Sequence, residues 1–426
     1  MASLYWANLI NFYQPPTCDR AELEQIVNKS YAPLLRIFSQ NPKSAVTINI
    51  PGSTVDLLIR TGFGTLIKKI AELADKGQIE FTLSPKYHPV MPLLGDDDND
   101  RQLEASIKIC KRYFGISYNP QGLYSPYLAY APRVSKTAAR FGLKWVAIDE
   151  SSIPAGPAQQ SESSDKFSCL YMDKSAGGVL LMPRHRELSD QLEGNIWAKK
   201  VPRTSNEYVQ NALRIAGNDK YFVTIVDAEH FGFITPGRYN LLRSIYGEPK
   251  LRPVNVSELR QHIKRKEFIK PLESSLANRQ INQRKKNQFL LWQDDSNPLQ
   301  QILWQLFNMS VAEIKNAGSK GDAQYTRARE MMDAASAGVN FSMLSCSPYW
   351  NGCYAMQAAD DLAIAVFVIL SSPLKAKENG IALRTKLYEQ IEQFEKNGEH
   401  RKQQKNYLRQ ANIPLDRAFG KSTERE

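Results

Sequence analysis

The amino-acid sequence predicts an α/β protein in which a parallel, seven-stranded barrel is followed by an all-α helical domain. Three observations carry this prediction: short apolar runs in the first 230 residues, helical patterns between them, and helical patterns alone after about residue 255. Regular alternation of strands and helices is typical of a parallel sheet, because the crossover between two parallel strands is usually a helix. About seven strands are enough to close such a sheet into a barrel, or nearly so.

Seven runs are predicted to be buried strands. Each run is short, apolar and bounded by polar or turn-forming residues, as is usual for a strand inside a parallel sheet. The runs are 4–10, 45–50, 79–83, 121–124, 144–148, 178–182 and 221–226. The last one is β-branched and ends abruptly in a polar stretch.

Helices are predicted between most of these strands and throughout the second half of the chain. Segment 65–76 repeats apolar residues at helical spacing, and Gly77 follows it where a glycine often ends a helix. The other predicted helices are 101–113, 133–141, 257–268, 298–316, 322–337, 358–370 and 377–408.

The change in pattern near residue 255 predicts a domain boundary. Residues 1–255 are expected to form the barrel domain and residues 256–415 a helical domain packed on it, with a disordered tail at 416–426. Segment 151–176 is rich in Ser, Pro and Ala and is long for a simple connector. It is either a loop over the strand ends or a tolerated insertion.

The composition indicates a protein of a reducing compartment. Hydrophobic residues make up 42% of the chain and charged residues 23%, which is ordinary for a globular protein. The five cysteines are odd in number and lack CxxC spacing, so neither a disulfide framework nor a zinc site is expected. The N-terminal residues lack a signal-peptide pattern, and the apolar run 362–370 is too short to span a bilayer. We therefore expect a cytoplasmic protein without membrane contact.

The net charge of +11 raises the question of a polyanionic partner. Much of the positive excess lies in 258–286 and 375–411, where aromatic residues are sparse and no nucleic-acid-binding signature is found. The pattern favours a solvated basic face over nucleic-acid binding. It does not determine the oligomeric state.

A candidate for chemistry follows the last predicted strand, where Asp227, Glu229 and His230 lie within four positions. In α/β proteins, ligands bind beyond the carboxyl ends of the strands, so these side chains are candidates for proton transfer. The alternative is a polar loop with a helix N-cap. Asp149-Glu150 is the other acidic pair at a predicted strand end, and Asp227 has no obvious carboxylate partner.

Three further stretches lie at or after predicted strand ends. Asn11, Tyr13 and Gln14 carry amide and phenol groups that can hydrogen-bond a polyol, although the Pro-Pro that follows fixes a turn by itself. His88 is a candidate ligand-binding side chain, or a structural histidine.

The third stretch contains three tyrosines, Tyr124, Tyr127 and Tyr130. They could form a stacking surface for a ligand or a packed aromatic corner.

Together these stretches resemble the signature regions of glycoside hydrolase family 57, α-glucan-active enzymes with a distorted (β/α)7 barrel. NFYQPP at 11–16 is similar to a first region that normally reads His-x-His-Gln-Pro. GQIEFTLSPKYHPVMPLL at 77–94 resembles the second region, and GLYSPYLAYAP at 122–132 the third, built on Pro-Glu-x-Ala-Tyr. VDAEHFG at 226–232 resembles the fourth, typically Asp-Gly-Glu-x-Phe-Gly, and SCSPYWNG at 345–352 the fifth.

The resemblance implies roles for individual residues, and the departures limit them. Asp227 stands at the family's acid/base position, with Glu229 beside it, whereas Tyr127 stands where the family has its nucleophilic glutamate. Asn11 replaces the first-region histidine, and Ala228 replaces a glycine. The implied substrate-binding residues are Asn11, Tyr13, Gln14, His88, Tyr124, Tyr130, His230 and Trp350.

The leading hypothesis is a protein that binds an oligosaccharide or α-glucan with strongly reduced retaining hydrolase or transglycosylase activity. Double displacement needs one carboxylate to attack and a second group to transfer the proton, and Asp227 supplies only the second role.

Other readings stay open. One is an active glycosidase on another, acidic glycan, with Tyr127 as nucleophile and Glu229 or Asp227 as base. Another is an inverting enzyme that uses Asp227 with a water-activating Glu229, and a third is a non-catalytic interaction protein. No cofactor and no metal are expected, because the five histidines show no paired ligand spacing and HxxxH is absent.

Overall fold

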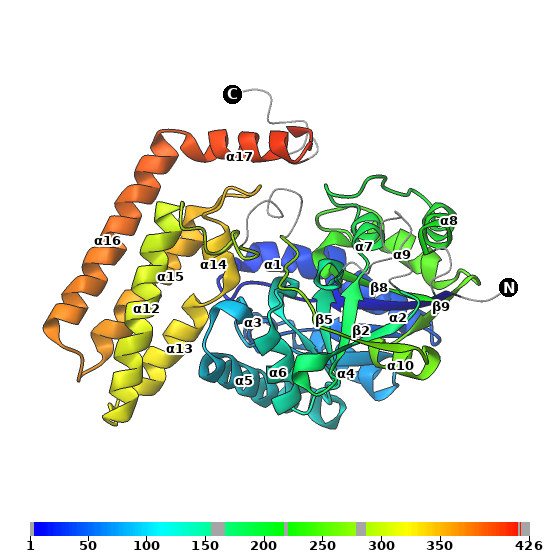
Figure 1. The fold of residues 1–426 in the computed structure, drawn as a ribbon, viewed down its shortest axis with the longest axis horizontal. Coiled ribbons are helices and arrows are strands. Elements are labelled where there is room, and N and C mark those ends of the chain that lie inside the picture. Colours follow the sequence, from blue (N-terminus) through cyan, green and yellow to red (C-terminus); the bar gives the residue numbers. More distant parts are fainter. Residues whose placement is uncertain (1–3, 155–166, 217–219, 278–286, 416–417, 419–426) are drawn as a thin grey trace. The chain divides into compact units, whose positions relative to one another are not determined.

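The computed structural model describes residues 4–154, 167–216, 220–277, 287–415 and 418. The chain divides into two compact units (Figure 1). The first contains residues 1–86 and 91–276, and the second contains residues 87–90 and 277–426. The division therefore comes after residue 276 rather than at 255, because a further strand in the first unit follows the change in pattern.

Seven parallel strands form the barrel of the first unit, which confirms the predicted (β/α)7 architecture. They are β1 (Leu4–Asn11), β2 (Val46–Asn49), β3 (Ile79–Leu83), β4 (Gly122–Tyr124), β5 (Trp145–Asp149), β7 (Leu180–Arg184) and β8 (Tyr221–Asp227). The hydrogen-bonded order runs β7-β5-β4-β3-β2-β1-β8. Next to the end of β7, the His185 main-chain N–H donates to Val223 O of β8 (2.8 Å), which brings the two edges together.

Three short strands that the sequence analysis missed extend this sheet. They are β6 (Leu170–Asp173), antiparallel to β7, β9 (Leu251–Val254), parallel to β1, and β10 (Lys266–Ile269), parallel to β6. The expectation of an all-helical chain after 255 was wrong on this point. The predicted helix 257–268 is reduced to a 3-10 turn, the short helix α10 and most of β10. In the predicted loop 151–176, residues 155–166 lie outside the described residues and residues 170–173 form β6.

Ten helices of the first unit, counted over its described residues, surround the strands (Figure 1). They are α1 (Arg20–Ile26), α2 (Ala32–Gln40), α3 (Gly52–Arg60), α4 (Gly64–Asp75), α5 (Asp96–Phe114), α6 (Pro132–Arg140), α7 (Arg186–Glu193), α8 (Ser205–Ala216), α9 (Arg238–Tyr246) and α10 (Leu259–His262). A π-helical segment, Val27–Tyr31, joins α1 to α2. Such segments often mark functional positions, and this one turns Ser30 toward the end of β8.

Two apolar layers hold the barrel together. Alternate residues of a strand point to opposite faces, and in β1 Trp6 and Ile10 pack outward against the helices while Ala7 and Leu9 belong to the interior cluster. Fully burying a large apolar side chain stabilises by roughly 1.5–3 kcal/mol, so this alternation fixes which face of each strand points inward.

The second unit is helical over its described residues. Its helices are α12 (Pro298–Ser319), α13 (Tyr325–Ala335), α14 (Gly338–Ser342), α15 (Gly352–Val368), α16 (Leu374–Lys396) and α17 (Glu399–Gln410). The predicted helix 377–408 is divided in two at Gly398, whose φ of 68° lies in the left-handed region. The expected tail 416–426 lies outside the described residues, apart from Ala418. Among the helices described, none is long and apolar enough to cross a membrane.

Candidate functional site

Each barrel strand places one polar side chain inward at its carboxyl end. In β1 and β8 the inward series Ala7, Leu9 and Val223, Ile225 is apolar and then changes to polar at the last position. The polar ring so formed consists of Asn11, Asn49, Thr82, Tyr124, Asp149, Arg184 and Asp227. Because the carboxyl ends of parallel strands lie together at one mouth of a barrel, this ring is the candidate site.

A chain of hydrogen bonds runs along the ring to Asp227. The Thr82 hydroxyl donates to Asn49 Oδ1 (2.8 Å), and Asn49 Nδ2 donates to Asn11 Oδ1 (2.7 Å). Asn11 Nδ2 in turn donates to Asp227 Oδ1 (2.8 Å). A carboxylate oxygen can only accept, so the direction of donation is consistent from one residue to the next. This series of hydrogen bonds fixes the orientation of the Asp227 carboxyl group.

Glu229 lies one turn beyond β8 and is held from two sides. Gln14 Nε2 donates to its Oε2 (2.9 Å), and the Ser30 hydroxyl donates to its main-chain oxygen (3.1 Å). Burial, together with the negative charges of Asp227 and Glu193, raises the pKa of Glu229 well above its usual value. Glu229 therefore holds a proton at a pH where an exposed glutamate has lost it.

Glu193 is a third carboxyl group at this place, and sequence reasoning missed it. It ends α7 and is buried, and its Oε1 accepts the main-chain N–H of Asp227 (2.8 Å). Its Oε2 accepts from Asn195 Nδ2 (2.6 Å) and lies 3.8 Å from Arg184 Nη2. Burial raises the pKa of Glu193, although His230 and Arg184 act in the opposite direction. The signal in the sequence was an acidic residue on the helix that directly follows a barrel strand.

Arg184 joins β7 to β8 beneath these carboxyl groups. Its Nη2 pairs with Asp190 Oδ1 (2.8 Å), and its Nε donates to Ile225 O (2.8 Å). The side chain is 3% exposed, so the ion pair is almost fully desolvated. Removing one partner of such a pair leaves an uncompensated buried charge, so Arg184 is a structural support for the Asp227 end of β8.

Arg186 binds both residues of the acidic pair Asp149-Glu150. The Arg186 guanidinium approaches both carboxyl oxygens of Asp149 (2.8 and 2.7 Å), and the Arg186 main-chain N–H donates to Glu150 Oε2 (3.1 Å). Asp149 thus has a positive partner of its own, whereas Asp227 is paired with an uncharged amide.

The three tyrosines of the predicted stacking surface have different surroundings. Tyr124 points inward from β4, and its pKa is raised by burial and by Asp227, so its hydroxyl stays neutral near the carboxyl cluster. Tyr130 is fully buried and donates to Asp173 Oδ2 (2.5 Å). In this structure the Tyr130 hydroxyl is thus used within the protein, and its role as a ligand contact stays a prediction.

Tyr127 lies on the turn that follows β4, with φ 59° and ψ 16°. A non-glycine residue in this left-handed region is uncommon and costs energy, and such residues are frequent at functional sites. Its main-chain oxygen accepts from the Leu276 N–H (2.8 Å), which helps to hold the turn.

The remaining predicted residues belong to both units. Tyr13 and His230 are half-buried in the first unit, Tyr13 on the loop between Asn11 and Gln14. His88 belongs to the second unit, where its main-chain oxygen accepts from Gly338 N–H (3.1 Å) and burial lowers the pKa of its imidazole to about 3.

Trp350 also belongs to the second unit. Its Nε1 donates to Glu395 Oε1 (2.8 Å) and its ring packs on Phe394, so it links the start of α15 to α16. In the described parts of the chain, no group of three or more His, Cys, Asp or Glu side chains is arranged to hold a metal ion.

The fold and the site together define a barrel protein with a carboxyl cluster at the carboxyl ends of its strands. The sequence model of glycosyl hydrolase family 57 matches residues 6–285, which is more than half of the chain. The chain belongs to this family.

Known relatives agree with this assignment at low identity. Alpha-amylase 1 of Dictyoglomus thermophilum is 23% identical over 249 residues, covering 58% of this chain and 34% of the amylase. The chain thus spans about a third of the length of that relative.

Among solved structures, the GH57-type branching enzyme from Pyrococcus horikoshii has a TM-score of 0.69 at 14% identity, covering 90% of this chain and 94% of the enzyme. The 4-alpha-glucanotransferase from Thermococcus litoralis has a TM-score of 0.65 at 16% identity, covering 86% and 60%. These likenesses show that the fold is shared.

Proposed function

We propose that the polar ring binds an oligosaccharide or α-glucan, and that retaining hydrolase or transglycosylase activity is strongly reduced. The observation that carries the proposal is the one-sided placement of the carboxyl groups. Asp227, Glu229 and Glu193 cluster at the end of β8, while Asp149 of β5 is held by Arg186. Strand β4, on the far side of the barrel order from β8, carries Tyr124 and is followed by Tyr127.

This placement bears directly on the chemistry. Retaining glycosidases use two carboxyl groups about 5–5.5 Å apart on opposite sides of the scissile bond, one as nucleophile and one as acid and base. By the family resemblance, the group opposite Asp227 is the phenol of Tyr127. A neutral phenol is a poor nucleophile, so the covalent intermediate would form slowly.

Binding does not need this nucleophile. The ring and its neighbours offer amides, carboxyl oxygens and phenols, which together can donate to and accept from sugar hydroxyls. The names of the relatives, an amylase, a branching enzyme and a glucanotransferase, make α-glucan the first ligand class to test.

The test is a calorimetric titration of the full chain with maltohexaose, combined with an assay of released reducing ends. We expect binding with turnover far below that of a working family member, and weaker binding in Asp227→Ala. The control is Glu72→Gln, which changes an exposed carboxyl group on α4. If the protein binds neither maltohexaose nor longer α-glucans, the proposal is wrong.

A second candidate is an inverting glycosidase, and the raised pKa of Glu229 beside Asp227 favours it. Inversion uses a protonated acid and a carboxylate that activates water. Glu229 was assigned water activation above, but a carboxyl group that keeps its proton suits the acid role, which leaves Asp227 as the base. The anomeric form of the first product, observed by NMR, distinguishes the two candidates. Two other hypotheses stay predictions. In one, Tyr127 acts as the nucleophile, and in the other, the protein is a non-catalytic interaction protein.

A further inference from the structure

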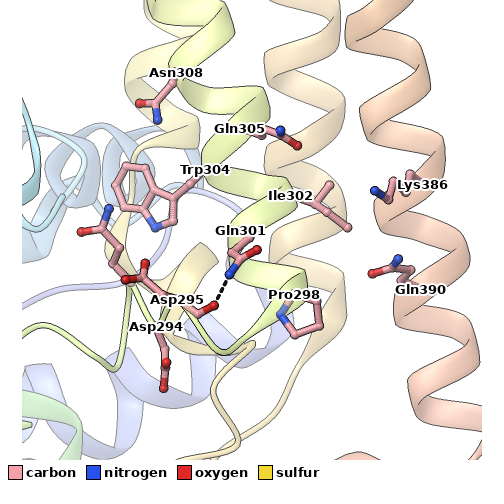
Figure 2. Close-up of a pocket in the computed structure, with 11 residues that line it drawn as sticks. Asp294, Asp295, Pro298, Gln301, Ile302, Trp304, Gln305, Asn308, Lys386 and Gln390 are labelled. Atoms are coloured by element: carbon pink, nitrogen blue, oxygen red, sulfur yellow. Dashed lines mark hydrogen bonds between the residues drawn. The ribbon is translucent and has the colours of Figure 1, made fainter. Parts of the chain in front are cut away.

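The helical unit contains a pocket of its own along α12, lined also by the loop before α12 and by α16, with a volume of about 470 Å³ (Figure 2). This volume lies within the range of small-molecule sites, roughly 300–1,000 Å³. The lining residues are Gln293, Asp294, Asp295, Pro298, Gln301, Ile302, Trp304, Gln305, Asn308, Lys386 and Gln390. All of them belong to the second unit.

The pocket lies toward one end of a helix pair that is tightly packed elsewhere. A Cβ added to Gly380 of α16 would lie 3.3 Å from Met309 Cε, so the Met309 side chain of α12 packs directly on α16 there. Toward the start of α12, the facing positions of α16 are Lys386 and Gln390, one helical turn apart. Both side chains are polar and line the pocket (Figure 2).

Four polar side chains of the pocket are available for a ligand. Within the described part of the chain, the side chains of Gln305, Asn308, Lys386 and Gln390 make no hydrogen bond or ion pair with other protein groups. Gln300, on the same helix, is the contrast. It is fully buried, donates to Leu291 O and Phe341 O, and accepts from Asp294 N–H. The side-chain amide of Gln300 is thus fully used inside the protein.

Trp304 supplies a rigid aromatic surface at the same pocket. Its Nε1 donates to Trp292 O (2.9 Å), and it stacks on Phe341 at 4.3 Å between ring centroids. These contacts fix the plane of the indole while the side chain stays half-exposed and lines the pocket. An aromatic ring held in this way loses little conformational entropy when a ligand stacks on it.

The charges select the kind of ligand. Asp294 and Asp295 oppose binding of an anion, and Lys386 opposes binding of a cation. The Asp294 carboxyl group is also used locally, since its Oδ1 accepts from Ser296 N–H (2.9 Å) and Oγ (2.6 Å). What is left is a nearly neutral pocket with several amide donors and acceptors and an aromatic surface.

From this arrangement we infer that the helical unit carries a second carbohydrate-binding site, which takes an uncharged oligosaccharide. Amides match the donor and acceptor pattern of sugar hydroxyls, and the indole matches the apolar face of a pyranose ring. The site goes beyond the proposed function, because it shares no residue with the polar ring and needs no catalysis.

The experiment is a calorimetric titration with maltohexaose, cellohexaose and, as a charged comparison, hexagalacturonate. It uses the full chain, the double variant Gln305→Ala/Gln390→Ala, and the double variant Asn316→Ala/Gln393→Ala as control. The control changes exposed amides on the same two helices outside the pocket. Asp227→Ala and the combination of Asp227→Ala with the pocket variant complete the set, and equal melting temperatures verify that the surface variants fold.

We expect a neutral hexaose to bind Asp227→Ala, and the pocket change to weaken that binding about tenfold or more, since it removes two amide hydrogen-bonding groups. The control should bind like the full chain, and hexagalacturonate should bind least. If the pocket variant binds all three ligands as the control does, or if no neutral hexaose binds Asp227→Ala, the inference is wrong. If instead the proposed function is wrong, Asp227→Ala binds maltohexaose as tightly as the unchanged chain does.

Discussion

At the scale of single residues, the orientation of Asp227 depends on one amide. Asn11 accepts from Asn49 and donates to Asp227, so it transmits the direction of the hydrogen-bond chain across β1. The resemblance places a histidine at this position in the family. Both asparagine and histidine can donate one N–H to a carboxylate, so this substitution is compatible with an unchanged orientation of the Asp227 carboxyl group.

The substitution Asn11→Leu should lower the free energy of unfolding by about 1–3 kcal/mol, because it leaves the buried Asn49 amide without its acceptor. It should also weaken binding of maltohexaose. Urea denaturation and calorimetry measure the two effects. Asn11→His is the matched variant, and it should retain more binding than the leucine variant. Equal binding by the two variants would contradict a positioning role of Asn11.

The raised pKa of Glu229 makes a prediction about pH. A carboxyl group whose pKa is higher in the folded than in the unfolded chain stabilises the fold below its ordinary value of 4.5, and this contribution is lost as the pH rises toward the folded value. In Glu229→Gln the contribution is absent, and the amide can still accept from Gln14. The free energy of unfolding should therefore fall less above pH 4.5 in Glu229→Gln than in the wild type. Parallel curves for the two proteins, with Glu72→Gln as control, would count against a protonated Glu229.

The sequence indicates which side chains lie together where a residue follows a strand, and it does not do so where the contact depends on the packing of a helix. The functional roles of these residues stay predictions. Asn11, Gln14, Asp227 and Glu229 were singled out because strand ends are readable, and the structure brings them together. Glu193 was not found, because its approach to Asp227 depends on how α7 packs against β8. The hydrogen bond of the buried Tyr130 to Asp173 could not be foreseen, because it links segments 43 positions apart.

At the scale of elements, the site depends on the close approach of the β8 turn to the π-helical segment. Gly232, with φ 131°, lies against the main-chain oxygen of Lys29, so a Cβ there would collide with it. The neighbouring Ser30 hydroxyl donates to Glu229 O and accepts from Phe233 N–H (3.2 Å). Glycine is thus required at this position for the two segments to meet.

The substitution Gly232→Ala should cost at least about 2 kcal/mol of unfolding free energy and weaken maltohexaose binding, because the segments must separate. Gly237→Ala is the control. It has a similar backbone restriction (φ 78°), but nothing lies within 4 Å of the added methyl group. Its cost should be near that of backbone strain alone, about 1 kcal/mol. Chemical denaturation compares the two, and equal costs would mean that the approach to Lys29 is not limiting.

Element boundaries were predictable where the apolar pattern was long and unclear where it was short. Segment 79–83 was predicted with the bounds that β3 has, since its apolar residues Ile79, Phe81 and Leu83 are buried and alternate with Glu80 and Thr82. β10 was mistaken for part of a helix, because its four residues alternate between exposed and half-buried positions at the sheet edge. Pairing with β6, and not local preference, makes this segment a strand.

At the scale of the whole molecule, the chain belongs to family 57 and has its barrel fold, and we propose that the chemistry has changed. The fold is shared with a branching enzyme at 14% identity, because alternation of inward and outward residues tolerates many apolar substitutions. The catalytic role is less tolerant, since it depends on a carboxyl group at one position. The account therefore rests on Tyr127.

The most direct measurement is the turnover of maltohexaose by the wild type, Tyr127→Glu and Tyr127→Gln. Restoring a carboxyl group at the turn after β4 should raise turnover, by about tenfold or more, because a covalent catalyst is worth orders of magnitude in rate. Tyr127→Gln, of similar size but without a nucleophile, should stay as slow as the wild type. Brisk retaining hydrolysis by the wild type, with no gain in Tyr127→Glu, would contradict the account.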